Sequence, residues 1–159
     1  AESVGLGALA YAMLAVDNSR DTVFDMDVAL SFEGRTGPYI QNAHVRAASI
    51  LKKFEGLKVE KLEGATFNFE LSSHEIELIE LLSRFPAVVE QAANEYRPMI
   101  MATYAYDLAS TFHSFYHAVP VLKSETDAIR DARLRLVAAA KQTLANALKL
   151  LALSAPEVM

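Results

Sequence analysis

The chain has no cysteine among its 159 residues, so neither disulfide bonds nor thiolate metal sites are available to it. It also lacks an apolar run of the roughly 20 residues that a bilayer-spanning helix needs. Residues 1–16 lack the basic opening of a secretory signal peptide. We therefore expect no membrane partner, no secreted disulfide scaffold and no zinc–thiolate module.

Motifs of common catalytic sites are missing as well. The sequence has no phosphate-binding Gly-x-x-x-x-Gly-Lys-Ser/Thr loop, no Gly-x-Ser-x-Gly elbow and no His-Glu-x-x-His helix. His113 and His117 would share a helical face, but two ligands without a carboxylate between them do not make a metal site. We expect no catalytic residue, no metal and no cofactor in this chain.

The charge of the chain is unevenly distributed. A net charge of −5 argues against sequence-independent nucleic-acid binding, and we do not expect DNA as a partner. Residues 35–53, however, carry Arg35, Arg46, Lys52 and Lys53 without a carboxylate, whereas residues 55–95 are mostly acidic. This segregation suits a small basic recognition patch.

The apolar residues, 52% of the chain, suffice for one domain with its own core. Their spacing predicts an all-α fold, a bundle of about five main helices. We expect these helices over residues 38–54, 73–84, 86–96, 98–118 and from a cap at Ser124 to residue 151, after a helix over 4–16 and a short one over 25–30. An irregular, ordered loop should occupy residues 56–69.

Proline and serine mark where the helices begin. Pro38, Pro86 and Pro98 suit the first helical position, where the missing N–H would be unpaired anyway. Ser72 with Glu75 forms a capping-box pattern, and the run Ser124-Glu-Thr-Asp can cap the last helix.

The buried faces follow the helical period. Apolar residues at steps of three and four predict a core made of Met101, Tyr104, Leu108, Phe112 and Phe115, together with Ile76, Ile79 and Leu82, and with Ile129, Leu136, Ala140, Leu144, Ala147 and Leu151.

The helix from Pro38 has two different faces. Its apolar arc contains Ile40, Ala43, Ala47, Ile50, Leu51 and Phe54, and the polar stripe beside it contains Tyr39, Asn42, Arg46, Ser49 and Lys53. Such groups stack on bases, hydrogen-bond their edges and neutralise phosphate. Most polar stripes are only solvated helix faces, so a helical protein–protein interaction domain, using this stripe or residues 75–84, stays open as an alternative.

Residues 31–49 contain the runs Ser-Phe-Glu-Gly, Thr-Gly-Pro-Tyr and Gln-Asn-Ala-His-Val-Arg. This stretch closely resembles the junction in arginyl-tRNA synthetases between the catalytic core and the helical anticodon-binding domain. The similarity continues through the runs that start at Tyr104, Phe112, Ala132 and Gln142 and ends on the Ala-Pro-Glu-Val-Met run at residues 155–159. Two positions depart from the family pattern, because Asn42 replaces the usual Tyr and Val158 replaces Arg.

The resemblance implies that residues 1–30 are the tail of a catalytic domain with its connector helix and that residues 31–159 form the anticodon-binding domain. The parent enzyme would be a cytoplasmic class I arginine–tRNA ligase that uses ATP with Mg²⁺. Its partners would be the anticodon loop of arginine tRNA and the catalytic and N-terminal domains of the same protein. The His-Ile-Gly-His-like and Lys-Met-Ser-Lys-Ser-like motifs of the class do not occur here, so we do not expect this chain to aminoacylate by itself.

The resemblance also implies a set of tRNA-binding residues. Ser31, Phe32, Glu33 and Arg35 belong to a loop that would press against the tRNA backbone, and Tyr39 and Arg46 would stack on and hydrogen-bond one anticodon base. Asn42 would offer an amide where the family has an aromatic ring. Tyr116 suits either the core or an RNA contact, and Met159 would pack at the anticodon.

Overall fold

The computed structural model describes residues 2–21, 23–54 and 69–159, and within these ranges all regular structure is helical. The elements in chain order are α1 (Glu2–Leu14), α2 (Met26–Ala29), α3 (Gly37–Lys52), α4 (Ser73–Ser83), α5 (Phe85–Asn94), α6 (Pro98–Ala118) and α7 (Asp127–Leu150). The all-α prediction is confirmed, and α3–α7 are the expected bundle. The predicted loop over 56–69 lies, apart from Phe69, outside the described residues.

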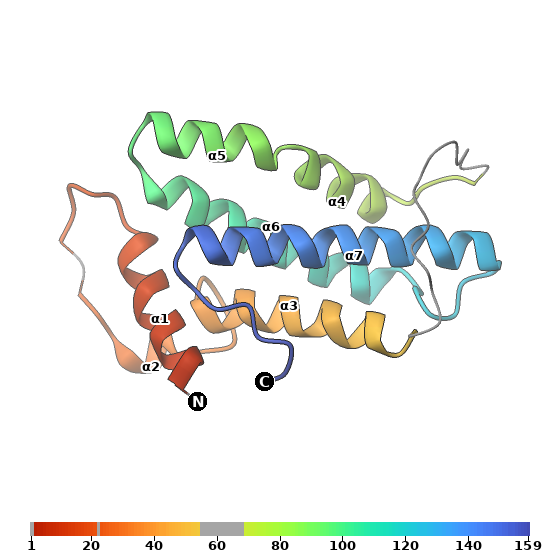
Figure 1. Cartoon of the computed structure of the whole chain (residues 1–159), viewed down its shortest axis with the longest axis horizontal. Helices are drawn as coiled ribbons and strands as arrows, with labels where there is room; N and C mark the ends of the chain where they lie inside the picture. Colours follow the sequence, from red (N-terminus) through yellow and green to blue (C-terminus); the bar gives the residue numbers. More distant parts are fainter. Residues whose placement is uncertain (1, 22, 55–68) are drawn as a thin grey trace.

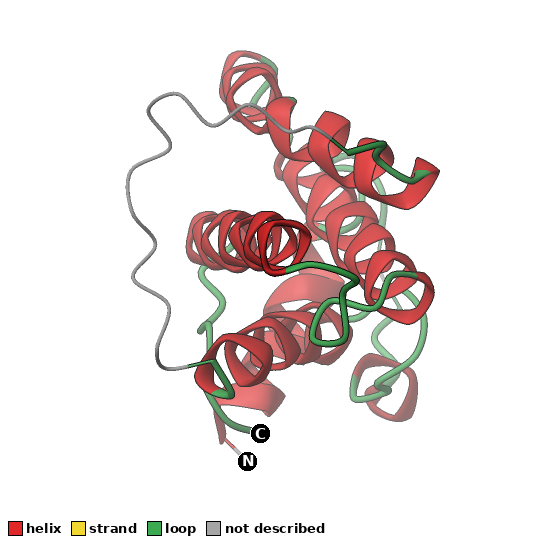
Figure 2. Cartoon of the chain, turned by 90° about the vertical axis from the view of Figure 1, so that its right-hand side faces the viewer, coloured by secondary structure: helices red, strands yellow, loops and turns green. Residues whose placement is uncertain are grey.

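Three long helices form the body of the molecule. In Figure 1, α3, α6 and α7 run along the long axis, α4 and α5 follow one another along one side, and α1 and α2 lie at one end. The view along the bundle in Figure 2 shows the helices surrounding a shared interior. No helix of the described ranges is long and apolar enough to cross a membrane.

Side-chain caps hold the starts of α3 and α4; the cap of α4 is the predicted one, whereas α3 begins one residue before the predicted Pro38. At α3 the Thr36 hydroxyl accepts a hydrogen bond from the Tyr39 N–H at 3.2 Å, with Pro38 in the first turn. At α4 the capping box is complete, because the Ser72 hydroxyl accepts from the Glu75 N–H at 3.3 Å and the Glu75 carboxylate accepts from the Ser72 N–H at 2.8 Å.

The predicted cap of the last helix is wrong by two residues. Thr126, not Ser124, caps α7, and its hydroxyl accepts from the Ile129 N–H at 3.3 Å. The Ser124 hydroxyl is engaged elsewhere, 2.8 Å from the Pro120 carbonyl oxygen and within 3.2 Å of the Arg133 guanidinium. The local pattern predicts Ser124 as the cap, but its hydroxyl forms hydrogen bonds with Pro120 and Arg133.

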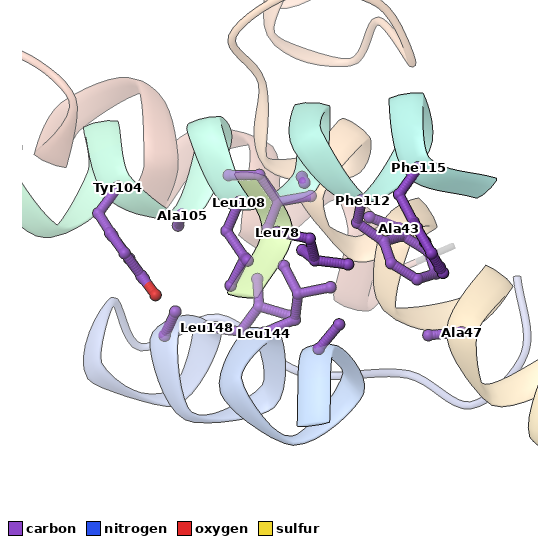
Figure 3. Packing of buried hydrophobic residues seen from close by; sticks show 14 of the residues in the cluster. Ala43, Ala47, Leu78, Tyr104, Ala105, Leu108, Phe112, Phe115, Leu144 and Leu148 are labelled. Carbon is purple, nitrogen blue, oxygen red and sulfur yellow. The ribbon is translucent and has the colours of Figure 1, made fainter. Parts of the chain in front are cut away.

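The core forms where α6 faces α7 and α3. Figure 3 shows side chains of α6 packed against the facing helices. All five residues predicted for the buried stripe of α6 are buried, and they meet Leu134, Val137, Ala140, Leu144 and Leu148 of α7 and Ile40, Ala43 and Ala47 of α3. Small side chains on α3 and α7 let these helices approach closely.

Helix α4 is rotated relative to the prediction. Ile76 and Ile79, expected in the core, are 44% and 41% exposed, while Leu78 is fully buried. The buried side of α4 also carries Glu75, which is 1% exposed and forms an ion pair with Arg133 of α7 at 2.8 Å. Apolar residues cover a broad arc of α4, and the Glu75–Arg133 ion pair favours the orientation in which the side with Glu75 and Leu78 faces the core.

Hydrogen bonds stabilise the charged form of Glu75. Burial of the carboxylate favours its neutral form, but hydrogen bonds from Arg133 and Ser72 outweigh burial and hold the Glu75 pKa below its usual 4.5. The resulting stability is complete above that usual value and is lost as the pH falls through the lower pKa of the folded state.

Helix α1 joins the bundle through a close backbone approach to α3. A Cβ atom added at Gly37 would collide with the Gly7 carbonyl oxygen, so only glycine fits there. One turn further along α1, Tyr11 is buried in the core, and its hydroxyl donates to the Ala102 carbonyl of α6 at 3.3 Å. This contact fixes where α3 lies relative to α1 and α6.

We predict that Gly37→Ala lowers the free energy of unfolding by about 1–3 kcal/mol, because the added methyl group must push two helix backbones apart. Denaturant unfolding of the 159-residue chain measures the change. Gly5→Ala is the matched control, since a Cβ at Gly5 meets nothing within 4 Å, and it should leave stability equal or raise it by about 0.5–1 kcal/mol. Equal effects of the two substitutions would refute the close approach.

We predict that Glu75→Gln lowers the free energy of unfolding at neutral pH by about 3–5 kcal/mol, because Arg133 is left buried without its counter-charge. The variant should also lose less additional stability than the unaltered chain when the pH is lowered from about 6 to about 3. Glu77→Gln, an exposed position on the same helix, should change neither quantity. Parallel acid dependence in the unaltered chain and Glu75→Gln would contradict this account.

Candidate nucleic-acid interface

A pocket of about 270 Å³ opens between α3 and the end of α6. Four polar residues of the predicted α3 stripe line it, namely Asn42, Arg46, Ser49 and Lys53. Tyr116 of α6 contributes an aromatic ring, and Val45, Ile50 and Leu122 complete the walls. The pocket combines amide, guanidinium, hydroxyl and ammonium groups with a ring face, which suits a small planar polar group.

Arg46 and Tyr116 are in direct contact. The Arg46 guanidinium carbon lies 5.6 Å from the centre of the Tyr116 ring, within the range of a cation–π interaction. Tyr116 is half-buried, because its ring packs on the core and also lines the pocket. The ring of Tyr116 thus packs on the core and also forms part of the pocket wall, and its RNA contact stays a prediction.

Tyr39 lies beside the pocket and does not line it. Its ring is 5.5 Å from that of Tyr106 and 5.1 Å from that of His113, and the Arg35 guanidinium lies 5.0 Å over Tyr106. Arg35, Tyr106, Tyr39 and His113 thus form a continuous row, which we call the aromatic row. Arg46 thus lies in the pocket and Tyr39 in the aromatic row, and the joint contact of these two residues with one base stays a prediction.

Tyr106 is absent from the residues proposed from the sequence. The available signal is its spacing, because Tyr106 and His113 are seven residues apart on α6 and so lie on one face, two turns apart. That face points toward Tyr39 of α3.

The loop before α3 is held by its own hydrogen bonds. The Thr36 hydroxyl donates to the Ser31 carbonyl at 2.6 Å, and the Ser31 hydroxyl accepts from the Glu33 N–H at 3.0 Å. Gly34 adopts a φ of 77°, which favours glycine. Phe32 is 53% exposed, so the loop presents an apolar ring and the Glu33 carboxylate to solvent.

His113 is neutral at physiological pH. Burial lowers its pKa to about 4, helped by the nearby positive charge of Arg46. Its Nδ1 atom is buried and has no hydrogen-bond partner in the described part of the chain. The neutral His113 ring adds no charge beside the pocket, and the cationic side chains that line the pocket are Arg46 and Lys53.

Met159 does not line the pocket and is 43% exposed. It ends a segment that passes alongside α3 in Figure 1 and lies close to the N-terminal end of the chain. Residues 2–21, 23–54 and 69–159 include no group of three His, Asp or Glu side chains placed to hold a metal ion.

The sequence of this region matches a known family over most of its length. The model of the DALR anticodon binding domain matches residues 40–159, which include the pocket, Tyr116 and Met159. The chain belongs to the DALR anticodon binding domain family. Helices α3–α7 of this DALR domain are thus the matched bundle, apart from the first turn of α3.

Curated relatives extend the similarity to the whole chain. The arginine–tRNA ligase of Thermococcus sibiricus is 46% identical over 164 residues, which cover all of this chain and 25% of that enzyme. The arginine–tRNA ligase of Pyrococcus abyssi is 47% identical over 160 residues, with the same shares. The DALR domain chain thus spans about a quarter of the length of the curated relatives it matches.

Solved structures agree with the sequence comparison. The Thermus thermophilus arginyl-tRNA synthetase superposes with a TM-score of 0.88 at 38% identity, over 99% of this chain and 27% of that one. The arginyl-tRNA synthetase of Plasmodium falciparum gives a TM-score of 0.85 at 28% identity, with the same coverage. The superposition includes α1 and α2, which lie outside the match to the family model.

We predict that His113 titrates with a pKa near 4 in the folded chain, against an ordinary value of 6.5. Because the unfolded chain takes up this proton first, His113 should make the fold less stable as the pH falls from 6.5 toward 4. An NMR titration of the His113 ring protons measures the pKa. Arg46→Ala should raise it by removing one positive neighbour, and burial should keep it below 6.5. An ordinary pKa would mean that the ring is exposed to water.

Proposed function

We propose that this DALR domain binds the anticodon loop of arginine tRNA through the pocket between α3 and α6. The observation that carries the proposal is that one pocket gathers Asn42, Arg46 and Tyr116, three residues that the family resemblance had singled out independently. The match to an anticodon binding domain supports an anticodon as the ligand, and the similarity to arginine–tRNA ligases supports arginine tRNA.

An unstacked base enters the pocket and stacks on the Arg46–Tyr116 pair. The Arg46 guanidinium carbon already lies 5.6 Å from the centre of the Tyr116 ring, and both side chains line the pocket that the base enters. Asn42 offers both a donor and acceptors to the base edge, which suits the amino group and two acceptors on the pairing edge of cytosine. Lys53 at the pocket rim neutralises a neighbouring phosphate.

The aromatic row and the loop before α3 extend this surface. Tyr39 and Tyr106 present partly exposed rings next to the pocket, and Arg35 supplies a charge for the RNA backbone. Ser31, Phe32 and Glu33 lie in the same loop and contact the backbone from the side. Met159 contributes a contact from the C-terminal end.

We also propose that the DALR domain acts within an arginine–tRNA ligase that uses ATP with Mg²⁺. The chain contributes no catalytic residue. Its role is to use binding energy at the anticodon to place the distant acceptor end of the tRNA in the catalytic part of the enzyme.

Residues 1–30 fit a role as the connection to that catalytic part. Helix α1 buries Gly7, Ala8 and Tyr11 against the bundle and exposes Leu6, Leu9 and Met13 at steps of three and four on its outer side. A helix that is apolar on both sides is typical of a segment covered on both sides. We propose that the catalytic domain covers the outer side, together with the exposed Val23, Met26 and Val28.

We predict that Arg46→Ala weakens binding of an arginine anticodon stem-loop by about 5- to 150-fold, because a base loses a stacking and hydrogen-bonding partner. The melting temperature should change little, since Arg46 makes no ion pair among the described residues and its contact with Tyr116 lies at the surface. Titration with a labelled stem-loop at fixed low salt measures the change in affinity. The control is Arg84→Ala, at an exposed position between α4 and α5, and this variant should bind the stem-loop normally.

The same titration with a stem-loop whose middle anticodon base is changed tests specificity. The unaltered chain should prefer the arginine loop, and the preference should survive added salt, because base contacts depend less on salt than phosphate contacts do. Equal binding of both loops, or of Arg46→Ala and the unaltered chain, would refute the assignment and favour a protein partner for this surface.

A further inference from the structure

The last six residues of the chain, which we call the C-terminal tail (residues 154–159), are seated on α3 by buried side chains. The Gln41 amide nitrogen lies 3.0 Å from the Ser154 carbonyl oxygen, and the His44 Nδ1 atom lies 2.8 Å from the Pro156 carbonyl oxygen. Gln41 is fully buried and His44 is 2% exposed. A third contact joins Lys141 of α7 to Glu157 at 2.8 Å.

These contacts provide hydrogen-bond partners for two buried polar side chains of α3. A buried polar group without a partner is destabilising, and the tail supplies acceptors for both Gln41 and His44. The Pro156 carbonyl can only accept, so the His44 proton lies on Nδ1. The Gln41 amide also reaches the Ser3 carbonyl of α1 at 3.3 Å, and this ties the tail, α1 and α3 together at one point.

The tail and the pocket use different sides of the same two turns of α3. Successive residues of a helix are about 100° apart, so Gln41 and His44 lie on one flank while Asn42 and Arg46 lie on the other. The two flanks are separated by about one helix diameter, ~10 Å. The tail follows α3 in the same direction, since Ser154 meets Gln41 and Pro156 meets His44.

We propose that Gln41 and His44 are positioning residues, which hold the C-terminal tail as the second flank of an RNA-binding surface centred on α3. The inference rests on the proposed function. An RNA loop seated in the pocket crosses the exposed ridge of α3 and meets the tail, where Val158 and Met159 are 79% and 43% exposed. Because the tail is held before the RNA arrives, less conformational entropy is lost on binding.

The RNA arm of the test compares His44→Leu, Gln41→Met and a chain ending at Glu157, each titrated with the arginine anticodon stem-loop. Each change should weaken binding by about 2- to 10-fold, the gain expected from ordering the tail in advance. Combining His44→Leu with the shortened chain should add little further loss, because the first change releases the tail and the second removes the residues with which the tail contacts RNA. Fully multiplicative losses would show that His44 does not act through the tail and would overturn the proposal.

The second arm needs no RNA. The chain has no cysteine, so Val158→Cys gives one site for a nitroxide label. His44→Leu and Gln41→Met should each make the label more mobile, and Lys141→Ala should do so more weakly. His74→Leu, on α4, is the control and should not. Helical content and melting temperature verify that each variant is folded.

Unchanged label mobility in folded His44→Leu and Gln41→Met would overturn the positioning role whatever the RNA result. Failure of the unaltered chain to bind RNA would instead overturn the proposed function and the RNA part of this inference, while the label would still decide whether Gln41 and His44 hold the tail. The two failures are thus distinguishable.

Discussion

The structure depends on the way α3 is fixed about its own axis. Ile40, Ala43 and Ala47 are fully buried against α6 and α7, and Gly37 lies against the α1 backbone. A rotation of α3 by one residue would turn Asn42 toward the core and move Ala43 out of it to the flank where His44 lies. The pocket, the aromatic row and the tail seat all depend on this orientation, because each uses side chains of α3 that flank its buried face.

The distribution of charge follows from the same arrangement. The described part of the acidic segment, residues 69–95, contains α4 and α5, and its deeply buried carboxylate, Glu75, is matched by Arg133 within the bundle. The cations of residues 35–53 lie on or near the exposed flank of α3, and the nearby ring of His113 is neutral at physiological pH. A chain of negative net charge can thus present a locally positive surface to RNA.

Local sequence signals predict the helices well. The helix-starting prolines, the Ser72–Glu75 capping box and the period of the α6 stripe depend on neighbours within a few residues. The structure has all of them, although Pro38 and Pro86 occupy the second helical position and not the first. Predictions that depend on distant partners fare less well. The Ser124 hydroxyl accepts a hydrogen bond from Arg133 and does not cap α7. Arg133 also forms the ion pair with the buried Glu75, and with Glu75 on the inner side of α4, Ile76 and Ile79 lie on its outer side.

The candidate site shows the same division. The period of α3 places Asn42, Arg46, Ser49 and Lys53 on one flank, and these line the pocket. The period cannot show that α6 inserts Tyr106 and His113 beside Tyr39, because that depends on how two helices cross. Nor does it reveal that Gln41 and His44, polar residues next to the buried arc, meet a segment more than 100 residues away.

The seat of the tail contacts mainly main chain. Gln41 and His44 meet the carbonyl oxygens of Ser154 and Pro156, groups that nearly any residue would supply at those positions. The path of the tail is therefore largely independent of which side chains it carries. A substitution at residue 158 or 159 would therefore change the side chain that the tail presents to solvent and leave the path of its backbone unchanged.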